Sequence, residues 1–357
     1  MTIDIWTLLP SVPKATARAA QAAEAEGWDG VLLPDSQNLG AELVVEMAMC
    51  VARTERVLIA PGVTNCVTRH PAVLASAMAT LQAESGGRMV LGIGRGDSAL
   101  AHIGCAPAPI ATFRRYLEAV QGYLRGETVV PHLEFAPAGA RPVAALKLGK
   151  EPEGSRLQWL RPRQPRVPID IAATGPKMIA LAATNGDGVA LSVGSDPERV
   201  RWAIGIARAA RQEAGLDPDG VRFAAHLNVA VHSDLAVARS LVSGGLASFS
   251  RFSVMDGTVT TEVGSGDAKL LADLHRGYDM VDHGRSTASH TAVLTEDFAI
   301  RNGVIGSPEQ CLDRLETLKD LGITRFMLME SFSREGDSGV AHSNLVREVL
   351  PVMRSWK

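Results

Sequence analysis

The chain has 357 residues, of which 46% are hydrophobic, so it is long enough to bury a large core. Lys and Arg number 36 against 39 Asp and Glu, which gives a formal net charge of −3, and aromatic residues make up 4% of the chain. These values argue against a protein that binds nucleic acid through a basic surface or an aromatic platform. No apolar run approaches the ~20 residues of a membrane span, and the first residues, MTIDIWTLLP, lack a basic start and a cleavage signature. We therefore expect a cytoplasmic protein that binds neither nucleic acid nor a membrane.

The four cysteines lie at positions 50, 66, 105 and 311, and no pair has the close spacing of a zinc ribbon. Each one sits in an apolar or loop context. We interpret them as reduced thiols of a cytosolic protein and expect no metal site.

Short β-branched runs alternate along the chain with Ala-rich amphipathic stretches, which is typical of a parallel sheet. Helices are expected at 14–27, 71–86 and 197–215, and each of these stretches ends on a glycine. Eight strands favour a (β/α)₈ TIM barrel over a doubly wound sheet, with the whole chain, residues 1–357, forming one domain. The strands are expected at residues 2–9, 30–34, 56–60, 89–93, 168–172, 188–193, 223–231 and 325–329.

Two segments interrupt the alternation. Residues 127–166 are rich in Pro, Gly and charge and follow the fourth helix, and residues 233–300 carry two helical patches. Insertions in a barrel fall in the loops on the C-terminal face, where they wall the pocket. We expect both segments there.

Small and polar residues follow five consecutive strands of the expected barrel. Each cluster alone has the composition of a turn, but the C-terminal ends of barrel strands share one rim, so their coincidence favours a site. The clusters are Asp35 to Asn38, Pro61 to Asn65, Gly94 to Ser98, Thr174 to Lys177, and Ser192.

The Thr174-Gly175-Pro176-Lys177 cluster is the sharpest local signal. Pro176 suits the first position of a helix over residues 177–185, whose free N–H groups and partial positive charge would suit a phosphate. Lys177 would add a full charge. The alternative is a capped helix with a solvated lysine.

Several motifs are absent. The G-x-G-x-x-G pattern fails because residue 97 is Asp97, and the chain has no Walker A, H-E-x-x-H or G-x-S-x-G stretch. Hydrolase and metalloprotease readings therefore lose their usual support. Among nine histidines, His226 lies inside the seventh expected strand and could line the barrel mouth.

Several of these stretches resemble the luciferase-like oxidoreductase superfamily, and most closely the methylenetetrahydromethanopterin reductases and their actinobacterial deazaflavin-dependent relatives. The resemblance runs over nearly the whole chain and is weak at the two insertions. It is carried by GVTN at 62–65, RHPAV at 69–73, SGGRMVLGIGRGDS at 85–98, GWDG at 27–30, TGPK at 174–177 with DGV at 187–189, and IGSPE at 305–309.

The resemblance implies a TIM barrel that holds a flavin or an 8-hydroxy-5-deazaflavin at its C-terminal rim. It also implies a non-prolyl cis peptide at Gly62-Val63, in a bulge that backs the central ring of the cofactor. Asp35 and Ser36 would border the ring. By the same matching, the ribityl chain, the polar edge and the phosphate would be bound by Thr64, Asn65, Asp97, Ser98, Ala173, Thr174, Gly175, Pro176 and Lys177, with Ser192 beside them.

The leading hypothesis is hydride transfer between C5 of the deazaflavin coenzyme F-420 and a small organic substrate, with Asp35, Asp97 and His226 as candidate proton handlers. Many relatives carry a histidine where this chain has Ser36, and the reductase carries a glutamate where it has Trp6, which argues against the methanogenic reductase itself.

Two alternatives remain. One is an FMN-dependent monooxygenase supplied by a separate flavin reductase, and the other is a non-catalytic flavin-binding protein. The insertions are expected to set the substrate. Relatives usually pair through helices beside the second and third strands, and the apolar stretch at 41–52 is compatible with such a homodimer.

Overall fold

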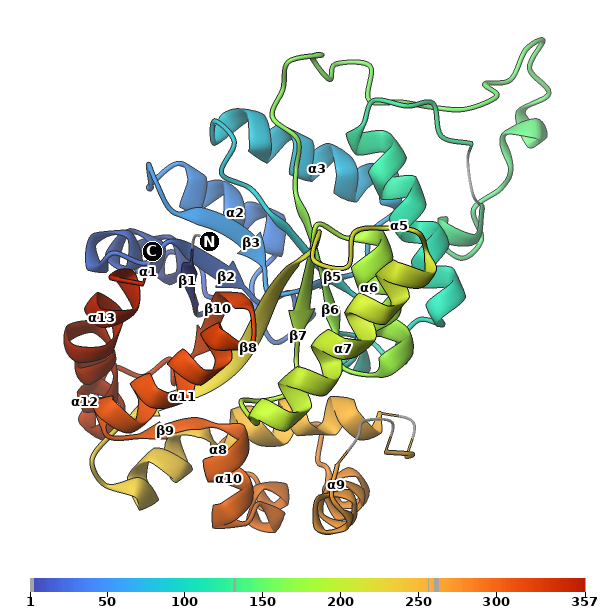
Figure 1. Ribbon diagram of the computed structural model, residues 1–357. Coiled ribbons are helices and arrows are strands. Elements are labelled where there is room, and N and C mark those ends of the chain that lie inside the picture. The colour runs from blue at the N-terminus through green and yellow to red at the C-terminus, as the bar shows by residue number, and fades with distance from the viewer. Residues whose placement is uncertain (1–2, 131–132, 256, 260–262, 357) are drawn as a thin grey trace.

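A nearly closed barrel of parallel strands forms the centre of the molecule (Figure 1). The computed structural model describes residues 3–130, 133–255, 257–259 and 263–356. All eight predicted strands are present, although Thr2, which the prediction placed in the first of them, lies outside the described residues. They are β1 Asp4–Leu8, β2 Gly30–Leu33, β3 Leu58–Pro61, β5 Leu91–Gly94, β6 Ile169–Ala173, β7 Gly188–Leu191, β8 Arg222–Val231 and β10 Ile323–Met329.

The strand order is β3-β2-β1-β10-β8-β7-β6-β5-β4, and the strand pairs are parallel. A parallel bridge between Ile59 of β3 and Met89, two residues before β5, brings the two sides of the sheet together. Two short strands were not predicted: β4 Thr64–Asn65, and β9 Val304–Gly306, which pairs with β8. The fold class predicted from the alternation, a (β/α)₈ barrel, is confirmed.

Helices surround the barrel on its outside (Figure 1). The three predicted helices correspond to α1, α3 and α7, and the helix predicted after Pro176 corresponds to α6. The α-helices are α1 Ala15–Glu26, α2 Leu43–Val51, α3 Pro71–Glu84, α4 Ser98–Ala101, α5 Ile110–Leu124, α6 Pro176–Asn185, α7 Pro197–Glu213, α8 Leu235–Arg251, α9 Ser265–Gly277, α10 Glu296–Asn302, α11 Pro308–Asp320, α12 Gly336–Asn344 and α13 Leu350–Arg354. Shorter turns of helix are η1 Leu133–Phe135, η2 Val143–Leu146, η3 Phe252–Val254, η4 Ser289–Val293 and the π-helical η5 Leu345–Val349.

Large side chains fill part of the barrel interior. Trp6 is fully buried there and packs with Leu32, Val90 and Met327. The ring of Trp6 leaves no room on β2: a Cβ atom on Gly30 would lie 2.3 Å from it. Because the glycine at position 30 has no Cβ atom, β2 can lie against the indole ring of Trp6.

A buried ion-pair network closes the N-terminal end of the barrel. Asp170 of β6 is 1% exposed and accepts hydrogen bonds from Arg325 Nη1 and Arg222 Nη2, both at 2.6 Å. Arg325 also reaches Asp4 at 2.8 Å, and its guanidinium carbon lies 4.4 Å from the centre of the Trp6 ring. The network joins β1, β6, β8 and β10 and blocks this end, so a cavity can open only at the C-terminal end.

The two insertions lie at opposite ends of the barrel (Figure 1). The described residues of 233–300 follow β8, cover the C-terminal face as predicted, and bury a small core of their own that includes Leu246, Leu271 and Phe298. Residues 127–166 do not lie where they were expected. The segment follows helix α5 and precedes β6, so it connects a helix to a strand. Its described residues run along the outside of α3, where Gln164 donates to the Ala79 carbonyl.

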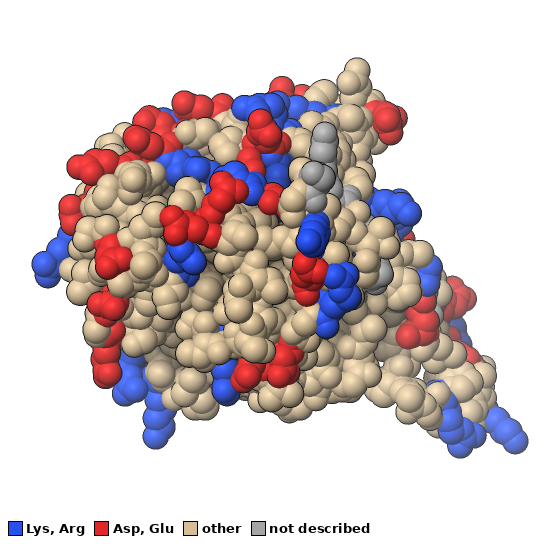
Figure 2. Space-filling model, turned by 90° about the horizontal axis from the view of Figure 1, so that it is seen from below, with Lys and Arg blue, Asp and Glu red and all other residues tan. Residues whose placement is uncertain are grey.

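Both signs of charge are mixed on the face of the molecule seen in Figure 2. Figure 2 shows one face of the molecule, on which Lys and Arg alternate with Asp and Glu around a broad area without charged side chains. This distribution matches the small formal net charge of −3. Among the described residues, no helix is both long enough and apolar enough to cross a membrane.

Replacing the buried carboxylate at the base of the barrel should destabilise the protein. Asp170→Asn would leave Arg325 and Arg222 facing an uncharged amide in a buried place, which should lower the free energy of unfolding by about 3 kcal/mol, measured by urea denaturation. Asp219→Asn is the matched control, because the Arg208–Asp219 pair is exposed on both sides. It should cost less than about 1 kcal/mol. Equal losses in the two variants would contradict the role given to the buried network.

Candidate functional site

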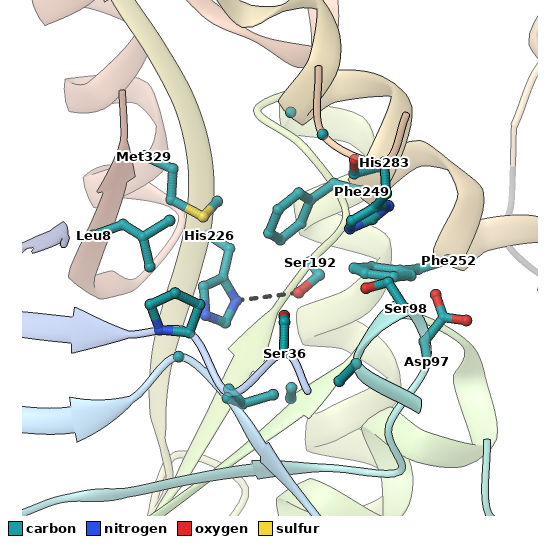
Figure 3. Close-up of a pocket in the computed structure, with 18 of the residues that line it drawn as sticks. Leu8, Ser36, Asp97, Ser98, Ser192, His226, Phe249, Phe252, His283 and Met329 are labelled. Carbon is teal, nitrogen blue, oxygen red and sulfur yellow. Dashed lines mark hydrogen bonds between the residues drawn. The ribbon is translucent and has the colours of Figure 1, made fainter. Parts of the chain in front are cut away.

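A cavity of about 1120 Å³ opens at the C-terminal ends of the strands (Figure 3). The loops that follow β1, β2, β3, β5, β6, β7 and β10 contribute to its lining, and so do β8 and the second insertion. None of the described residues of the first insertion lines it. All five polar clusters that the sequence placed at one rim reach this cavity. The predicted site residues that line it are Asp35, Ser36, Gly62, Val63, Thr64, Asp97, Ser98, Ala173, Thr174, Gly175, Pro176, Lys177, Ser192 and His226.

Asp35 is held by three neighbours at the end of β2. Arg69 Nη1 donates to its carboxylate at 2.7 Å, Thr64 Oγ1 at 2.6 Å and Gln37 Nε2 at 2.8 Å. The pKa of Arg69 is raised: burial would lower it, but the hydrogen bonds and charges of Asp35 and Glu42 outweigh that effect. A carboxylate held by a guanidinium and two further donors is a structural anchor, and it ties the loop after β2 to the loop after β4.

Asp97 is also paired. It follows β5 and forms a salt bridge with Arg251, at the end of α8. Both side chains are nearly buried, and the guanidinium carbon of Arg251 lies 4.9 Å from the centre of the Tyr278 ring. The pair fastens the second insertion to the barrel rim across 154 positions of the chain.

His226 lies on β8 and faces the cavity, as the sequence suggested (Figure 3). Its Nδ1 shares a hydrogen bond of 3.1 Å with the hydroxyl of Ser192, from the end of β7. Burial lowers the pKa of His226 to about 4, so the imidazole is neutral at neutral pH. A neutral imidazole can both donate and accept a hydrogen bond, and a substrate in the cavity would meet it in that form.

The loop after β6 ends at the beginning of α6. Gly175 is the N-cap residue of that helix, Pro176 is its first residue, and no side chain caps its free N–H groups. Lys177 is exposed at the cavity and forms no salt bridge with a described carboxylate. An uncapped helix N-terminus beside a lysine is a favourable place for an anionic group.

The segment after β3 carries the cis peptide that the resemblance implied. The peptide bond between Gly62 and Val63 is cis, and both residues line the cavity. The neighbouring strand β5 passes close to it: a Cβ atom on Gly92 would lie 2.2 Å from the Pro61 carbonyl oxygen. Glycine is therefore required at 92 for β5 to lie against this segment.

Asn65 differs from the other predicted site residues. It is 1% exposed and does not line the cavity. Its amide oxygen accepts hydrogen bonds from the backbone N–H groups of Val67 and Thr68, both at 2.9 Å. In this position Asn65 shapes the turn after β4, and a direct contact with a bound molecule stays a prediction.

The sequence analysis missed the wall that the second insertion builds. Phe249 of α8 and Phe252 of η3 project into the cavity opposite Leu8 and Met329 (Figure 3). His283 lies beside them, and its Nδ1 shares a hydrogen bond of 2.6 Å with the Tyr278 hydroxyl. The sequence pattern gave only a helical patch here, because the facing of Phe249 depends on how α8 packs over the barrel.

The edge of the cavity after β10 is fastened to the outer helices. Glu330 lines this edge and accepts hydrogen bonds from Arg334 Nη2 at 3.0 Å and from His342 Nδ1 at 2.9 Å. His342 Nε2 lies 3.2 Å from the carboxylate of Glu26, at the end of α1. Hydrogen bonds to Glu26 and Glu330 raise the pKa of His342 to about 9, so the imidazole is charged at neutral pH and links the two carboxylates.

Comparison with known proteins agrees with this geometry. Residues 2–325 match the family model described as luciferase-like monooxygenase. A 5,10-methylenetetrahydromethanopterin reductase of Methanolobus tindarius is 29% identical over 331 residues, which cover 92% of this chain and 93% of the relative.

Solved structures share the fold. The coenzyme F420-dependent tetrahydromethanopterin reductase of Methanopyrus kandleri superposes with a TM-score of 0.75 at 20% identity and covers 99% of both chains. An F420-dependent secondary alcohol dehydrogenase, solved with an F420-acetone adduct, gives a TM-score of 0.72 at 19% identity, with 99% of this chain and 100% of the other covered. A barrel with its cavity at the C-terminal rim defines the class, and the family match makes the assignment specific. The chain belongs to the luciferase-like monooxygenase family.

The charged state of His342 should make stability depend on alkaline pH. The pKa is raised from 6.5 to about 9 in the folded protein, so the stabilisation is fully present below 6.5 and is lost as the pH rises through about 9. The free energy of unfolding, measured by urea denaturation across this window, should fall more steeply for the wild type than for His342→Gln. His232→Gln is the matched control. The His232 ring accepts a hydrogen bond from the Asp234 backbone N–H, which carries no charge, whereas the His342 ring lies between two carboxylates. A wild-type slope that survives in His342→Gln would refute the assignment.

Proposed function

We propose that the chain is a single-domain, cytoplasmic oxidoreductase that uses the deazaflavin coenzyme F-420 to transfer a hydride to or from a small organic substrate. The observation that carries this proposal is the match, over 92% of this chain, to a relative named as a 5,10-methylenetetrahydromethanopterin reductase. Further relatives that match about half of the chain or more carry names that include F420 dependence. The family alone would allow either a flavin or a deazaflavin.

The cavity fits a cofactor with a planar ring system at one end and a phosphate at the other. The uncapped N-terminus of α6 and the exposed Lys177 supply an anion site without any neutralising carboxylate among the described residues. Gly175 carries no side chain, and Thr174 and Ser192 bring hydroxyl groups to the same cavity. These residues would hold the phosphate, while Ser98 and Thr64 lie where polar atoms nearer the ring would bind.

The residues near the cofactor ring would contribute by holding the ring and the substrate in place. The backbone at Gly62 and Val63 forms part of the cavity floor, against which one face of a ring would rest. Bound there, the deazaflavin supplies a carbon that donates or accepts a hydride. The protein's own contribution is to hold the substrate against the opposite face at about 3–3.5 Å and to exclude water.

Of the three proposed proton handlers, His226 is the one that the surroundings leave available. Asp35 is held by Arg69 and Asp97 by Arg251, so protonating either carboxylate would break a salt bridge in a nearly buried place. His226 is neutral and faces the cavity. We assign it the task of holding the proton at the reacting atom of the substrate.

An FMN-dependent monooxygenase is the second candidate, because the matching family model carries that description. Such an enzyme would need a flavin reductase as partner. The same anion site would hold the phosphate of FMN, so the phosphate loop does not separate the two cofactors. A non-catalytic flavin-binding protein is a weaker reading, because His226 remains free to act in the cavity.

Binding of the two cofactors to the purified protein tests the proposal. Calorimetry should give micromolar affinity for oxidised coenzyme F-420 and much weaker binding of FMN. Lys177→Ala should weaken deazaflavin binding about tenfold, because one charge-assisted contact to the phosphate is lost. Lys269→Ala, an exposed lysine on α9 that does not line the cavity, is the matched control and should have no effect. The reverse order of affinities would move the protein to the monooxygenase reading.

We further propose that two copies of the chain pair through α2 and α3. Val45 and Met49 of α2 are 59% and 46% exposed, one helical turn apart, and Val73 of α3 is 57% exposed beside them. An apolar groove between the two helices, lined by Val44, Ala48, Ala72, Val73 and Leu157 among others, continues this surface. A second copy would cover these side chains by the same surface, as a two-fold interface requires.

A charged side chain placed in this surface should prevent the two copies of the chain from pairing. Sedimentation velocity should give twice the chain mass of 37.8 kDa for the wild type and the single-chain mass for Met49→Glu. Leu216→Glu is the control, since Leu216 is 40% exposed beyond the end of α7 and away from α2. A wild type that sediments as a single chain, or a Met49→Glu variant that stays paired, would rule out this interface.

A further inference from the structure

Helix α8 lies directly over the barrel mouth because two consecutive glycines allow a close approach. A Cβ atom on Gly245 would lie 2.0 Å from the side-chain oxygen of Asn228 on β8, and one on Gly244 would lie 2.3 Å from the Gly284 carbonyl oxygen. The helix therefore packs against both the barrel and the loop that contains His283. This packing turns the open end of the barrel into a walled chamber.

The side chains that α8 and its neighbours present to this chamber are apolar. Phe249 lies with its ring centre 5.9 Å from that of His226 and 5.3 Å from that of Phe252 (Figure 3). Leu8 and Met329 face them from β1 and from the end of β10 (Figure 3). The remaining apolar members of this wall are Leu241, Val242, Met255 and Phe332.

Charged groups on this side of the cavity are already neutralised. Arg251 is paired with Asp97, and Glu330 is bound by Arg334 and by the charged His342. Arg285, at the outer edge, lies 3.1 Å from Asp282. Among the described lining residues, the cations without a carboxylate partner are Lys177 and Arg95, whose Nε donates to the Ala108 carbonyl, and both come from the loops after β5 and β6. A charge held against the wall formed by α8 and η3 would find no counter-ion on that wall, and burying an unpaired charge is strongly unfavourable.

The anion site comes from a different part of the chain. Lys177, at the beginning of α6, is exposed and has no carboxylate partner among the described residues. It lies on the loop after β6, whereas the aromatic wall comes from α8 and η3. The cavity lining thus combines an anion site from one loop with an apolar wall from the second insertion. His226 is a neutral polar group beside that wall and shares a hydrogen bond with Ser192.

We infer that the substrate is an uncharged, largely apolar molecule whose single reacting oxygen, a carbonyl or a hydroxyl, is held by His226 while its carbon chain packs against Phe249 and Phe252. This inference rests on the proposed hydride transfer. In the reducing direction a hydride adds to the carbonyl carbon, the π electron pair of the C–O bond moves to the oxygen, and one proton joins that oxygen through the imidazole of His226, which regains a proton from solvent. The two electrons come from the reduced deazaflavin, and an alcohol is oxidised by the same steps reversed.

Binding of matched ketones and carboxylates tests this inference. With excess oxidised coenzyme F-420 present to occupy the anion site, the purified protein is titrated by calorimetry with methyl ethyl, methyl butyl and methyl hexyl ketone, and with butanoate, hexanoate and octanoate. We expect the ketone affinity to rise up to about fourfold for each added methylene, since each one buries apolar surface in the chamber. We expect the carboxylates to bind much more weakly than ketones of similar length. Equal or tighter carboxylate binding, or a ketone affinity that does not change with chain length, would overturn the inference.

Two variants test whether the ketones bind in the chamber. Phe249→Ala should lower the affinity for methyl hexyl ketone about tenfold and leave deazaflavin binding unchanged. Phe332→Ala is the second variant, because Phe332 lines the cavity yet is 51% exposed and so carries little of the core. It should lower the affinity severalfold. Val281→Ala, in the same insertion and 78% exposed outside the cavity, is the matched control.

Ligand binding in the two titrations separates this inference from the proposed function. Ketones that bind as expected to a protein that binds no deazaflavin would overturn the proposed function and support the apolar chamber. Deazaflavin binding together with preferred binding of carboxylates would overturn the substrate class alone. Ketone binding that Phe249→Ala and Phe332→Ala leave unchanged would show that the ligand sits elsewhere and would overturn the inference.

Discussion

Closing a parallel barrel creates an interior that must be filled, and the way this chain fills it decides where everything else lies. Trp6 occupies the lower interior, and the buried Asp170–Arg325 pair beneath it joins strands from opposite sides of the barrel. With that end blocked by side chains, the remaining interior space opens only at the C-terminal ends of the strands. The position of the cavity is thus a consequence of packing, and the loops after the strands become its walls.

Salt bridges around the cavity decide which of its polar residues are available for chemistry. Asp35 and Asp97 are the residue types that general acid–base catalysis uses, but each is held by an arginine from another part of the chain. Their contribution is to fix loops: Asp35 joins the loops after β2 and β4, and Asp97 joins the barrel to α8. His226 has no such partner, and its hydrogen bond to Ser192 orients the ring without charging it.

Much of the barrel could be predicted from the sequence, because short β-branched runs and amphipathic stretches report local geometry directly. The strands, the helix after Pro176 and the polar clusters at their ends were all found in this way. The two-residue β4 and the three-residue β9 are too short to leave such a pattern. The first insertion was misplaced because composition marks a segment as irregular but does not tell whether it follows a helix or a strand.

The partners of the polar residues could not be predicted, because they depend on contacts between distant segments. Arg251 lies 154 positions from Asp97, and nothing in its local sequence distinguishes it from a solvated arginine at a helix end. Likewise, nothing in the local sequence distinguishes Phe249 from other residues of an amphipathic helix. Its place in the cavity wall depends on Gly244 and Gly245, which let that helix pack closely on the barrel mouth. The same close packing brings an aromatic wall and a neutral histidine into one chamber. We propose that specificity in this chain arises less from the barrel, which many proteins share, than from how closely one inserted helix approaches it.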